Sequence, residues 1–571
     1  MSTSSCPPIQ EVTTAIHQLY TNGDQAADKY LTACVSQPWG FELGARLLTE
    51  TAPNDTDSKF YGSHIICQKC SKKTDLDNLK PQLRTQIITV LFNTLNSTTL
   101  TNQVLHRVAQ ALAMLAVGDA QGYGMSTLLL NDARLQQLPL ERSLDVLKRA
   151  ADELSAGEDN EYVRAEFDDV RTVWECVMRA LLLFSFPTQC NNNEMNSLNS
   201  TLPLQCTAEN IQNTALLQKM YQCATSWAPY GTTLGYLSKM NLLNPLLQSV
   251  ASSTTFQNAS LFLIEIMKAT DMQGDLIENE TALQVLSCIA SLTPALAAAT
   301  QAGNQDEFCI QLSHVCADVL MTTMDFINLQ DGSGLTSGAT TQVISLAIQC
   351  TSHPSLRVSE YQTEVWERFS ELPPHLRPLQ LQSPLFTEVL KAIVQRVSYS
   401  NSDSSNIKTI LDETDSMEEE DRSIYRRNHA PNLLEICFRE CRQAMEAYLA
   451  TELSTCLYPH RVEAALYVLK CIGPAVREEY SNAANETNRN AKDVQINQYF
   501  QWIRHAGASR CSAWCQSAMG AMSVFLPWIQ QENSRVEAAV QYTIAIVREA
   551  GSNGNGGNGG IIVDYALTGL S

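Results

Sequence analysis

The sequence predicts an all-α protein with the fold of a HEAT-repeat, right-handed superhelical α-solenoid. Apolar residues recur with the 3.6-residue period of a helix along nearly the whole chain, and the alternating apolar pattern of strands is almost absent. The length of 571 residues, 44% of them apolar, exceeds what one compact domain holds and suits an extended array. Several separate helical domains are the alternative interpretation.

Apolar stripes predict successive helices from the N-terminus onward. A first stripe lies on Val12, Ala15, Ile16, Leu19 and Tyr20, and a second runs over residues 27–35 after the polar breaker at 21–24. Pro38 opens a third helix, because proline is tolerated in a first turn. Further stripes predict helices over 104–115 and, as one continuous helix, over 433–448. Hairpins of roughly 40–47 residues would give about a dozen such units, each burying its apolar face against neighbours.

Composition shifts along the chain predict five parts. Residues 1–120 hold the first hairpins, and residues 121–397 hold the central repeats. Residues 398–430 are polar and then acidic, which is typical of a long mobile insertion. Residues 431–550 continue the repeats, and residues 551–571 form a Gly/Asn-rich linker with a short tail. A linker that leads to so little predicts a truncated chain or an unusual gene product.

The charge of the chain limits its partners. The net charge is −21, from 39 basic and 60 acidic residues, which disfavours direct binding of nucleic acid or an anionic membrane and favours a basic partner. The densest acids have two interpretations, a solvated loop or a flap that contacts a basic partner. They are Asp412, Glu413, Asp415, Glu418, Glu419, Glu420 and Asp421.

No segment of the sequence is expected to cross or enter a membrane. Residues 281–305 and 511–531 lack charge, but polar residues and a proline interrupt each, so buried helices explain both stretches better. The N-terminus has neither a basic segment nor an apolar segment behind it, so no signal peptide is visible.

Motifs for catalysis, cofactors or metals are not found in the sequence. Cys67-Gln-Lys-Cys70 lacks a second pair of zinc ligands, and it shares a helical stripe with Phe60, Ser63 and Ile66, which favours core packing. The 18 cysteines are scattered and are expected to be small buried hydrophobes. No H-E-x-x-H, G-x-S-x-G or phosphate-binding loop occurs, so we expect neither an enzyme nor a cofactor. A cysteine hydrolase would also lack an identifiable nucleophile–base pair.

Two N-terminal segments carry a further pattern. Residues 27–50 contain Trp39 and end near the pair Leu47-Leu48, and residues 59–73 open with Phe60-Tyr61 and end in lysines. This pattern resembles the N-terminal domain of the importin-β (karyopherin-β) superfamily. Four other segments resemble, in the same order, parts of its transportin-SR/importin-thirteen branch: residues 11–20, 103–117, 226–237 and 343–369.

The resemblance implies a nuclear transport receptor, an importin that wraps protein cargo and releases it when Ran-GTP binds. It also implies contact with Phe-Gly nucleoporins and shuttling between cytoplasm and nucleus through the nuclear pore. Basic protein cargo fits the charge, with Arg-Ser-rich splicing factors among the candidates. In the family, the second helices of the first hairpins face Ran. The matching helix here is 59–73, and its face opposite the core stripe carries Tyr61, Ile65, Gln68, Lys69 and Lys72.

The chain departs from that family in its length. Full-length members are longer, so this chain is expected to lack the C-terminal part, including the basic helix that reads phosphorylated Arg-Ser domains. A second interpretation stays open, a HEAT-repeat scaffold or adaptor that works without Ran.

Overall fold

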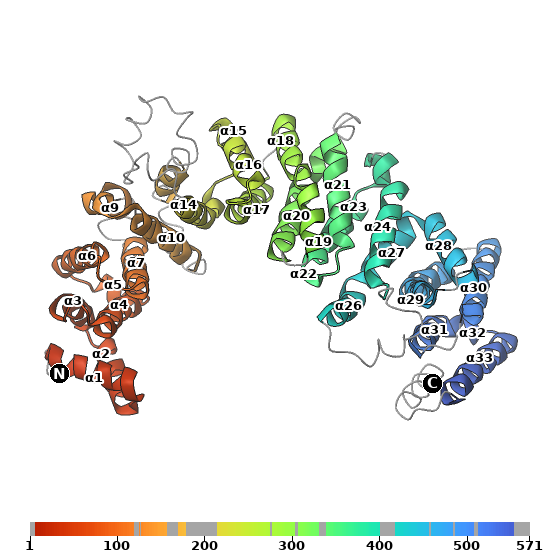
Figure 1. Ribbon diagram of the computed structural model, residues 1–571, viewed down its shortest axis with the longest axis horizontal. Helices are drawn as coiled ribbons and strands as arrows, with labels where there is room; N and C mark the ends of the chain where they lie inside the picture. The colour runs from red at the N-terminus through yellow and green to blue at the C-terminus, as the bar shows by residue number, and fades with distance from the viewer. Residues whose placement is uncertain are drawn as a thin grey trace. The chain divides into compact units, whose positions relative to one another are not determined.

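The protein is built from helices in all the parts that the structure describes. The computed structural model describes residues 6–118, 125, 127–156, 170–178, 214–274, 277–302, 306–329, 338–377, 379–399, 417–455, 458–482, 486–506 and 512–552. Within these ranges every regular element is a helix, as Figure 1 shows, so the predicted all-α class is confirmed. The chain divides into two compact units, residues 1–281 and 282–571, and each is described by itself.

Unit 1 consists of helical hairpins stacked in two rows. Helices α1, α3 and α6 form a first row, and α2, α4, α7, α10, α14 and α17 form a second row, each helix packing on the next in its row. The hairpins α1–α2, α3–α4 and α6–α7 join the two rows. The bounds are α1 Ile9–Asn22, α2 Gln25–Ser36, α3 Gly40–Glu50, α4 Thr56–Cys70, α5 Lys73–Asp77, α6 Pro81–Leu95, α7 Asn102–Val117, α9 Ala133–Gln137, α10 Leu140–Ala156, α14 Thr214–Trp227, α15 Leu234–Lys239, α16 Leu243–Ala251 and α17 Phe256–Gln273.

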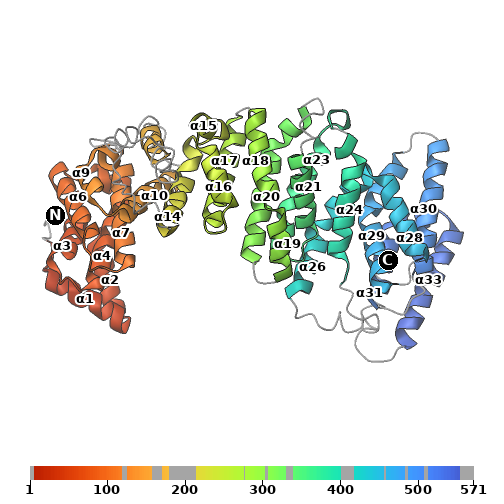
Figure 2. The same ribbon diagram turned by 45° about the horizontal axis from the view of Figure 1, so that its top comes forward.

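Unit 2 repeats the two-row arrangement, and Figure 2 shows its helices side by side. Helices α19, α21, α24, α28 and α30 form its first row, and α20, α23, α27, α29 and α31 its second row. The bounds are α18 Asn279–Ala290, α19 Thr293–Ala302, α20 Asp306–Leu329, α21 Gly338–Thr351, α22 Leu356–Ser359, α23 Tyr361–Glu371, α24 Ser383–Val397, α26 Met417–Asn428, α27 Ala430–Glu440, α28 Arg442–Thr455, α29 Pro459–Ser481, α30 Glu486–Ala506, α31 Ser512–Val524, α32 Leu526–Ile529 and α33 Asn533–Ser552.

The first breaker behaves as the sequence predicts. Gly23 adopts a left-handed conformation with φ of 65°, which only glycine takes at little cost, and its N–H bonds to the carbonyl of Leu19. Asp24 then accepts a hydrogen bond from the backbone of Ala26 at 2.8 Å and caps α2. The stripes on both sides, from Val12 to Val35, meet in one buried cluster.

The continuous helix predicted over 433–448 is wrong. Helix α27 ends at Glu440, and α28 begins at Arg442, because Cys441 leaves helical geometry with φ of −132° and ψ of 42°. The apolar stripe is kept up to the break, since Leu433, Cys437 and Cys441 are all buried, and after it the buried positions move to Met445 and Leu449. The two halves of the segment have different neighbours: α28 packs on α30, whereas α27 packs on α23.

One stretch of the described chain is long and apolar enough to span a membrane by length and composition, Asn279–Ala302, with a mean hydropathy of 1.7. It folds as two helices, α18 and α19, with a turn at residues 291 and 292. Val285, Leu286 and Ile289 are fully buried in the protein, as the sequence-based interpretation expected. The packing is that of a core helix pair.

The second half of the expected mobile insertion is a well-packed helix. Helix α26 packs on α22, α24 and α27. Its Arg426 forms two hydrogen bonds to the carboxylate of Glu463 in α29, at 3.0 and 2.5 Å, and both side chains are buried or nearly so. The remaining part of the insertion, residues 400–416, lies outside the described residues.

Candidate functional site

Helix α4 is the element on which the sequence placed the Ran-binding residues. It begins after Asp55, whose side chain accepts a hydrogen bond from the backbone of Ser58 at 3.1 Å and so caps the first turn. The helix packs on α3 on one side and on α7 on another, and it also contacts α1 and α2. With neighbours in its own row and in the other row, it leaves only a narrow strip to solvent.

The expected open face of α4 is wrong for three of its five residues. Tyr61 and Ile65 belong to the buried cluster that also contains Leu43 and Leu47. Lys69 is 3% exposed, and its ammonium lies 2.8 Å from the carboxylate of Asp75. Its aliphatic stem crosses the surface of Gly40, where an added Cβ would lie 3.2 Å from Lys69 Cε. Side chains placed in this way stabilise the first hairpins and cannot reach a partner.

The strip that stays open on α4 runs along Phe60, His64 and Gln68, spaced four residues apart. Phe60 and His64 are half-buried, Gln68 is exposed, and the exposed Lys72 follows at the start of α5. The rings of Phe60 and His64 stack, with centroids 6.5 Å apart and planes 3° from parallel. Burial lowers the pKa of His64, and the neighbouring Arg107 lowers it further, so the imidazole is neutral at physiological pH. Sequence reasoning assigned Phe60 to the core stripe and did not use His64, although their spacing marks one face.

Polar contacts continue this strip onto the next two helices of the row. The guanidinium of Arg107 in α7 lies 5.8 Å from the centroid of the Phe60 ring. It also donates to the side-chain oxygen of Gln110 at 2.8 Å. The amide nitrogen of Gln110 in turn donates to Glu153 of α10 at 2.9 Å. Helices α4, α7 and α10 are therefore linked through partly exposed polar side chains.

Similar contacts link α10 to α14 and α14 to α17. Lys219 lies 3.4 Å from Asp145, and the hydroxyl of Ser226 donates to Asp152 at 2.9 Å. The amide of Gln222 donates to Asn258 at 3.2 Å. We call the whole set the polar ladder; it consists of Phe60, His64, Gln68, Arg107, Gln110, Glu153, Asp145, Lys148, Asp152, Lys219, Gln222, Ser226 and Asn258.

The polar ladder combines hydrogen bonds with partly exposed ion pairs. Its ion pairs are about one-third exposed on both sides, as for Lys148 with Asp152 and Lys219 with Asp145. Pairs of this kind contribute only about 0–1 kcal/mol each. They can therefore exchange their partner for a charged group of another protein at little cost. Charges of both signs occur along the ladder.

The acidic run singled out in the sequence lies partly on α26. Glu418, Glu419, Glu420 and Asp421 fall in its first turns, whereas Asp412, Glu413 and Asp415 lie outside the described residues. Glu420 is exposed. Asp421 accepts a hydrogen bond from the backbone N–H of Leu356 at 2.9 Å and so holds the start of α22. An acidic residue expected to contact a partner thus has an internal role.

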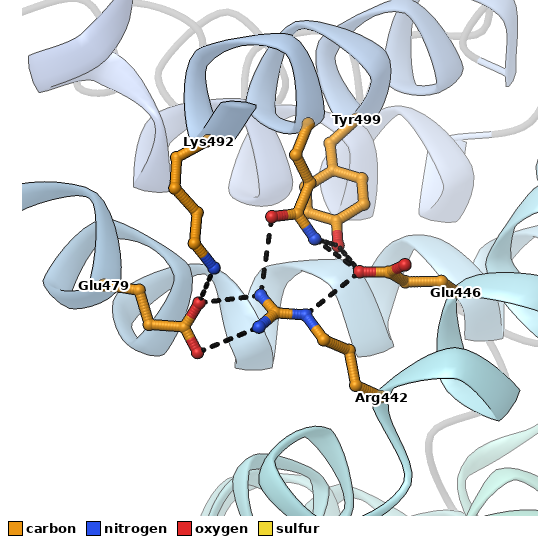
Figure 3. A network of polar contacts seen from close by, with 6 residues as sticks. Arg442, Glu446, Glu479, Lys492 and Tyr499 are labelled. Atoms are coloured by element: carbon orange, nitrogen blue, oxygen red, sulfur yellow. Dashed lines mark hydrogen bonds and ion pairs between the residues drawn. The ribbon is translucent and has the colours of Figure 1, made fainter. Parts of the chain in front are cut away.

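A second polar network lies in unit 2, between α28, α29 and α30 (Figure 3). Arg442 donates to both oxygens of Glu479, at 2.7 and 3.2 Å, and to Glu446 at 3.2 Å. Lys492 pairs with Glu479, and the hydroxyl of Tyr499 donates to Glu446 at 3.0 Å. Burial raises the pKa of Glu479, but hydrogen bonds from Arg442 and Lys492 outweigh it and lower the pKa overall. Every labelled group has a partner, so the network ties three helices together.

Reactive cysteines and metal clusters are not features of the described residues. No group of three or more His, Cys, Asp or Glu side chains is placed to hold a metal ion among the residues that the structure describes. Burial raises the pKa of Cys67 and of Cys350 to about 12, opposite to the activation that a nucleophile needs. A hydrogen bond with Cys437 lowers the pKa of Cys441, but that thiol is only 1% exposed. These cysteines pack as small hydrophobes.

Comparison with known proteins identifies the fold. No protein-family model matches the sequence. No curated protein matches it either. Among solved structures, importin 13 in its cytosolic state superposes with a TM-score of 0.55 at 13% identity, over 86% of this chain. Kap121p bound to Nup53p gives a TM-score of 0.53 at 11% identity over 99%, and Kap121p bound to Pho4p gives 0.50 at 12% over 98%. The fold is therefore the HEAT-repeat α-solenoid of the karyopherins.

The chain is shorter than the proteins that it resembles. It spans 60% of the importin 13 chain, and 45% and 49% of the two Kap121p chains. The likeness covers nearly all of this chain, in both units. At a sequence identity of 11–13%, the likeness shows the fold but does not identify the residues of a site.

Proposed function

We propose that this protein is a nuclear transport receptor of the importin kind. It binds basic protein cargo, releases it when Ran-GTP binds, contacts Phe-Gly nucleoporins and shuttles between cytoplasm and nucleus. It acts as a binding protein rather than an enzyme, without direct contact to nucleic acid or membrane. The observation that carries the proposal is the fold likeness to importin 13 and Kap121p over 86–99% of the chain.

Three further observations support the proposal. Segments spread over residues 11–369 resemble, in order, parts of the importin-β superfamily. The Kap121p structures contain a nucleoporin, Nup53p, and a further protein, Pho4p, so this fold binds protein ligands of both kinds. The net charge of −21 suits basic cargo.

The Ran-binding role is proposed for the open residues of the first hairpins. Gln68 and Lys72 are the two exposed members of the five residues expected from the sequence. Arg107, at the neighbouring step of the polar ladder, adds a partly exposed cation beside them. Ran-GTP and cargo would then bind with negative cooperativity, each weakening the binding of the other by the same factor.

A Ran-independent HEAT scaffold is the second candidate function. The observation in its favour is the burial of Tyr61, Ile65 and Lys69, which removes most of the expected Ran-facing residues from the surface. A scaffold would use the same polar ladder to hold one or more proteins constitutively.

Binding to Ran in its two nucleotide states separates the two functions. The full chain is immobilised and exposed to Ran loaded with a non-hydrolysable GTP analogue or with GDP. Binding of the GTP form alone, together with release of a pre-bound basic protein, supports the import receptor. Equal binding of both forms, or of neither, contradicts it and leaves the scaffold.

A further inference from the structure

A groove in unit 2 belongs to none of the surfaces described above. It lies between the first-row helices α24 and α28, and it is closed by α26 and the first turn of α29. Its volume is about 720 Å³, within the range of sites that hold small ligands or short segments. Helix α28 begins directly after the break at Cys441, and its Ala444 and Tyr448 line the groove.

The floor of the groove is apolar. Leu390 and Val394, one turn apart on α24, face Ala444 on α28, and Pro354 lies beside them. Val394 and Ala444 are only half-buried, so they offer apolar surface to a ligand. A side chain of moderate size seated between the two helices would lose its contact with water.

The walls of the groove are basic, in contrast to the rest of the chain. Lys391, Arg396, Arg422 and Arg461 line it, and Glu452 is the one acid among the lining residues. His460 also lines it, and burial together with Arg461 lowers the pKa of that imidazole. Three of these cations, Lys391, Arg422 and Arg461, reach the surface, whereas Arg396 is buried behind it. A chain with a net charge of −21 thus gathers several cations around one small depression.

Aromatic rings and an ion pair hold these cations in place. The guanidinium of Arg396, which is 3% exposed, lies 5.2 Å from the ring centroid of Tyr425. That of Arg422 lies 5.5 Å from the ring of Tyr399. Arg461 donates to Glu452 at the far wall. Contacts of this type orient a guanidinium before a ligand arrives, which reduces the entropy lost on binding.

We propose that this groove binds an acidic peptide segment of a partner protein, with one apolar side chain on the floor and carboxylates against the basic walls. Guanidinium groups match carboxylates in shape and charge. The apolar floor favours a peptide over an inorganic anion, because only the peptide can bury an apolar side chain there. A nucleic acid fits less well, because it would bring many more negative charges than a short peptide to a chain whose net charge is −21. The proposal stands independently of Ran and of nuclear transport.

The test uses the full chain and a labelled synthetic peptide of about twelve residues, in which Asp and Glu alternate with Leu and one Phe. A second, uncharged peptide carries Asn or Gln at every acidic position. Fluorescence anisotropy is expected to detect saturable binding of the acidic peptide, weakened by salt, and none of the uncharged peptide. Equal binding of both peptides, or binding of neither, overturns the proposal.

Two variants locate the binding in the groove. Ala444→Trp fills the floor without changing charge and is expected to abolish binding. Lys391→Glu is expected to weaken it about five- to tenfold, because Lys391 is exposed on the wall and its pair with Glu388 is exposed too. Lys268→Glu is the matched control, since Lys268 in α17 has the same exposed pairing with an acid three residues earlier.

The pattern across the variants decides the outcome. Unchanged binding by Ala444→Trp, with a melting temperature equal to that of the wild type, overturns the proposal. Equal losses in Lys391→Glu and Lys268→Glu also overturn it, because they report only the charge of the chain. A single-stranded RNA oligonucleotide that displaces the peptide and responds to the same variants would assign the groove to nucleic acid instead.

Discussion

Gly44 of α3 and Gly62 of α4 face each other at the closest approach of the two helices. A Cβ added to Gly62 would lie 2.9 Å from the carbonyl oxygen of Gly44, and one added to Gly44 would lie 2.7 Å from Ile66 Cγ1. Two residues without side chains therefore set the spacing of the hairpin that presents Gln68 and the polar ladder. Glycine is required here by close backbone approach rather than by an unusual dihedral angle.

Replacing Gly62 by alanine is expected to destabilise unit 1 by about 1–3 kcal/mol, because the clash is with backbone that cannot move alone. Hydrogen–deuterium exchange should become faster in α3 and α4 first. Gly338→Ala is the control, since a Cβ at this exposed helix start would meet nothing within 4 Å. Unchanged protection of the α3–α4 hairpin would contradict the assignment of a tight contact.

Lys69 and Lys72 are expected to respond differently to charge reversal, although they are close in sequence. Lys69→Glu places a second carboxylate beside Asp75 in a buried site and should cost about 3 kcal/mol of stability. Lys72→Glu changes an exposed residue and should alter stability by less than about 0.5 kcal/mol.

Charge reversal at Lys72 also tests the proposed Ran-binding surface. Under that proposal, Lys72→Glu weakens binding of Ran-GTP about fivefold, measured by surface plasmon resonance with the full chain. Lys239→Glu, an exposed lysine on α15, is the control for net charge. If both variants bind alike, the start of α5 is not part of a Ran-binding surface.

Much of the fold follows from the apolar period alone. Stripes such as Val12 to Tyr20 predict helices, and helices with one apolar face must stack, so the row arrangement is expected. The break at Cys441 was not visible because the stripe continues through Leu433, Cys437 and Cys441 in register. The burial of Arg426 was equally hidden, since local composition around it is polar and its partner Glu463 lies 37 residues away.

The candidate site was harder to predict than the fold. The sequence-based assignment gave α4 one buried face, but a second-row helix has neighbours in both rows. Ile65 and Ile66 are both fully buried, each against a different neighbour set, so one stripe cannot describe the core of this helix. The polar ladder depends on pairs such as Gln110 with Glu153, 43 residues apart, which only the stacking of helices brings together.

The network around Glu479 predicts a pH-dependent contribution to stability. Its pKa in the folded protein lies below the ordinary value of 4.5, because the hydrogen bonds of Arg442 and Lys492 outweigh burial. The network therefore stabilises the fold fully above that value, and this contribution is lost as the pH falls through the lower folded pKa.

Glu479→Gln should accordingly lower the unfolding free energy by about 1 kcal/mol at pH 7, a modest value because these groups are partly exposed. The difference from the wild type should shrink below pH 4.5. Glu478→Gln, an exposed neighbour on the same helix, is the control. A difference that stays constant with pH would mean that the charge of Glu479 does not matter.

Thiol labelling tests the assignment of cysteines to the core. Burial raises the pKa of Cys350 to about 12, and its side chain is fully buried, so it should react with maleimide only after unfolding. The half-buried Cys6 should react before Cys350 in the native protein, as read by mass spectrometry. Denaturant should equalise the two rates. Native labelling of Cys350 as fast as that of Cys6 would exclude a structural role in the core.

The buried pair of Arg426 and Glu463 should be costly to break. Arg426 also donates to the carbonyl of Val397 at 3.0 Å, while Glu463 accepts from Ser517 at 2.6 Å, so the pair joins α24, α26, α29 and α31. Arg426→Met and Glu463→Met should each cost about 3–5 kcal/mol, because each strands a buried charge. In urea unfolding, the double variant should lose about 2 kcal/mol less stability than the sum of the two single losses.

The exposed pair Arg439 with Glu435 is the matched control, with a coupling energy below about 0.5 kcal/mol. Additive losses for Arg426 and Glu463 would show that α26 is held by its apolar contacts instead.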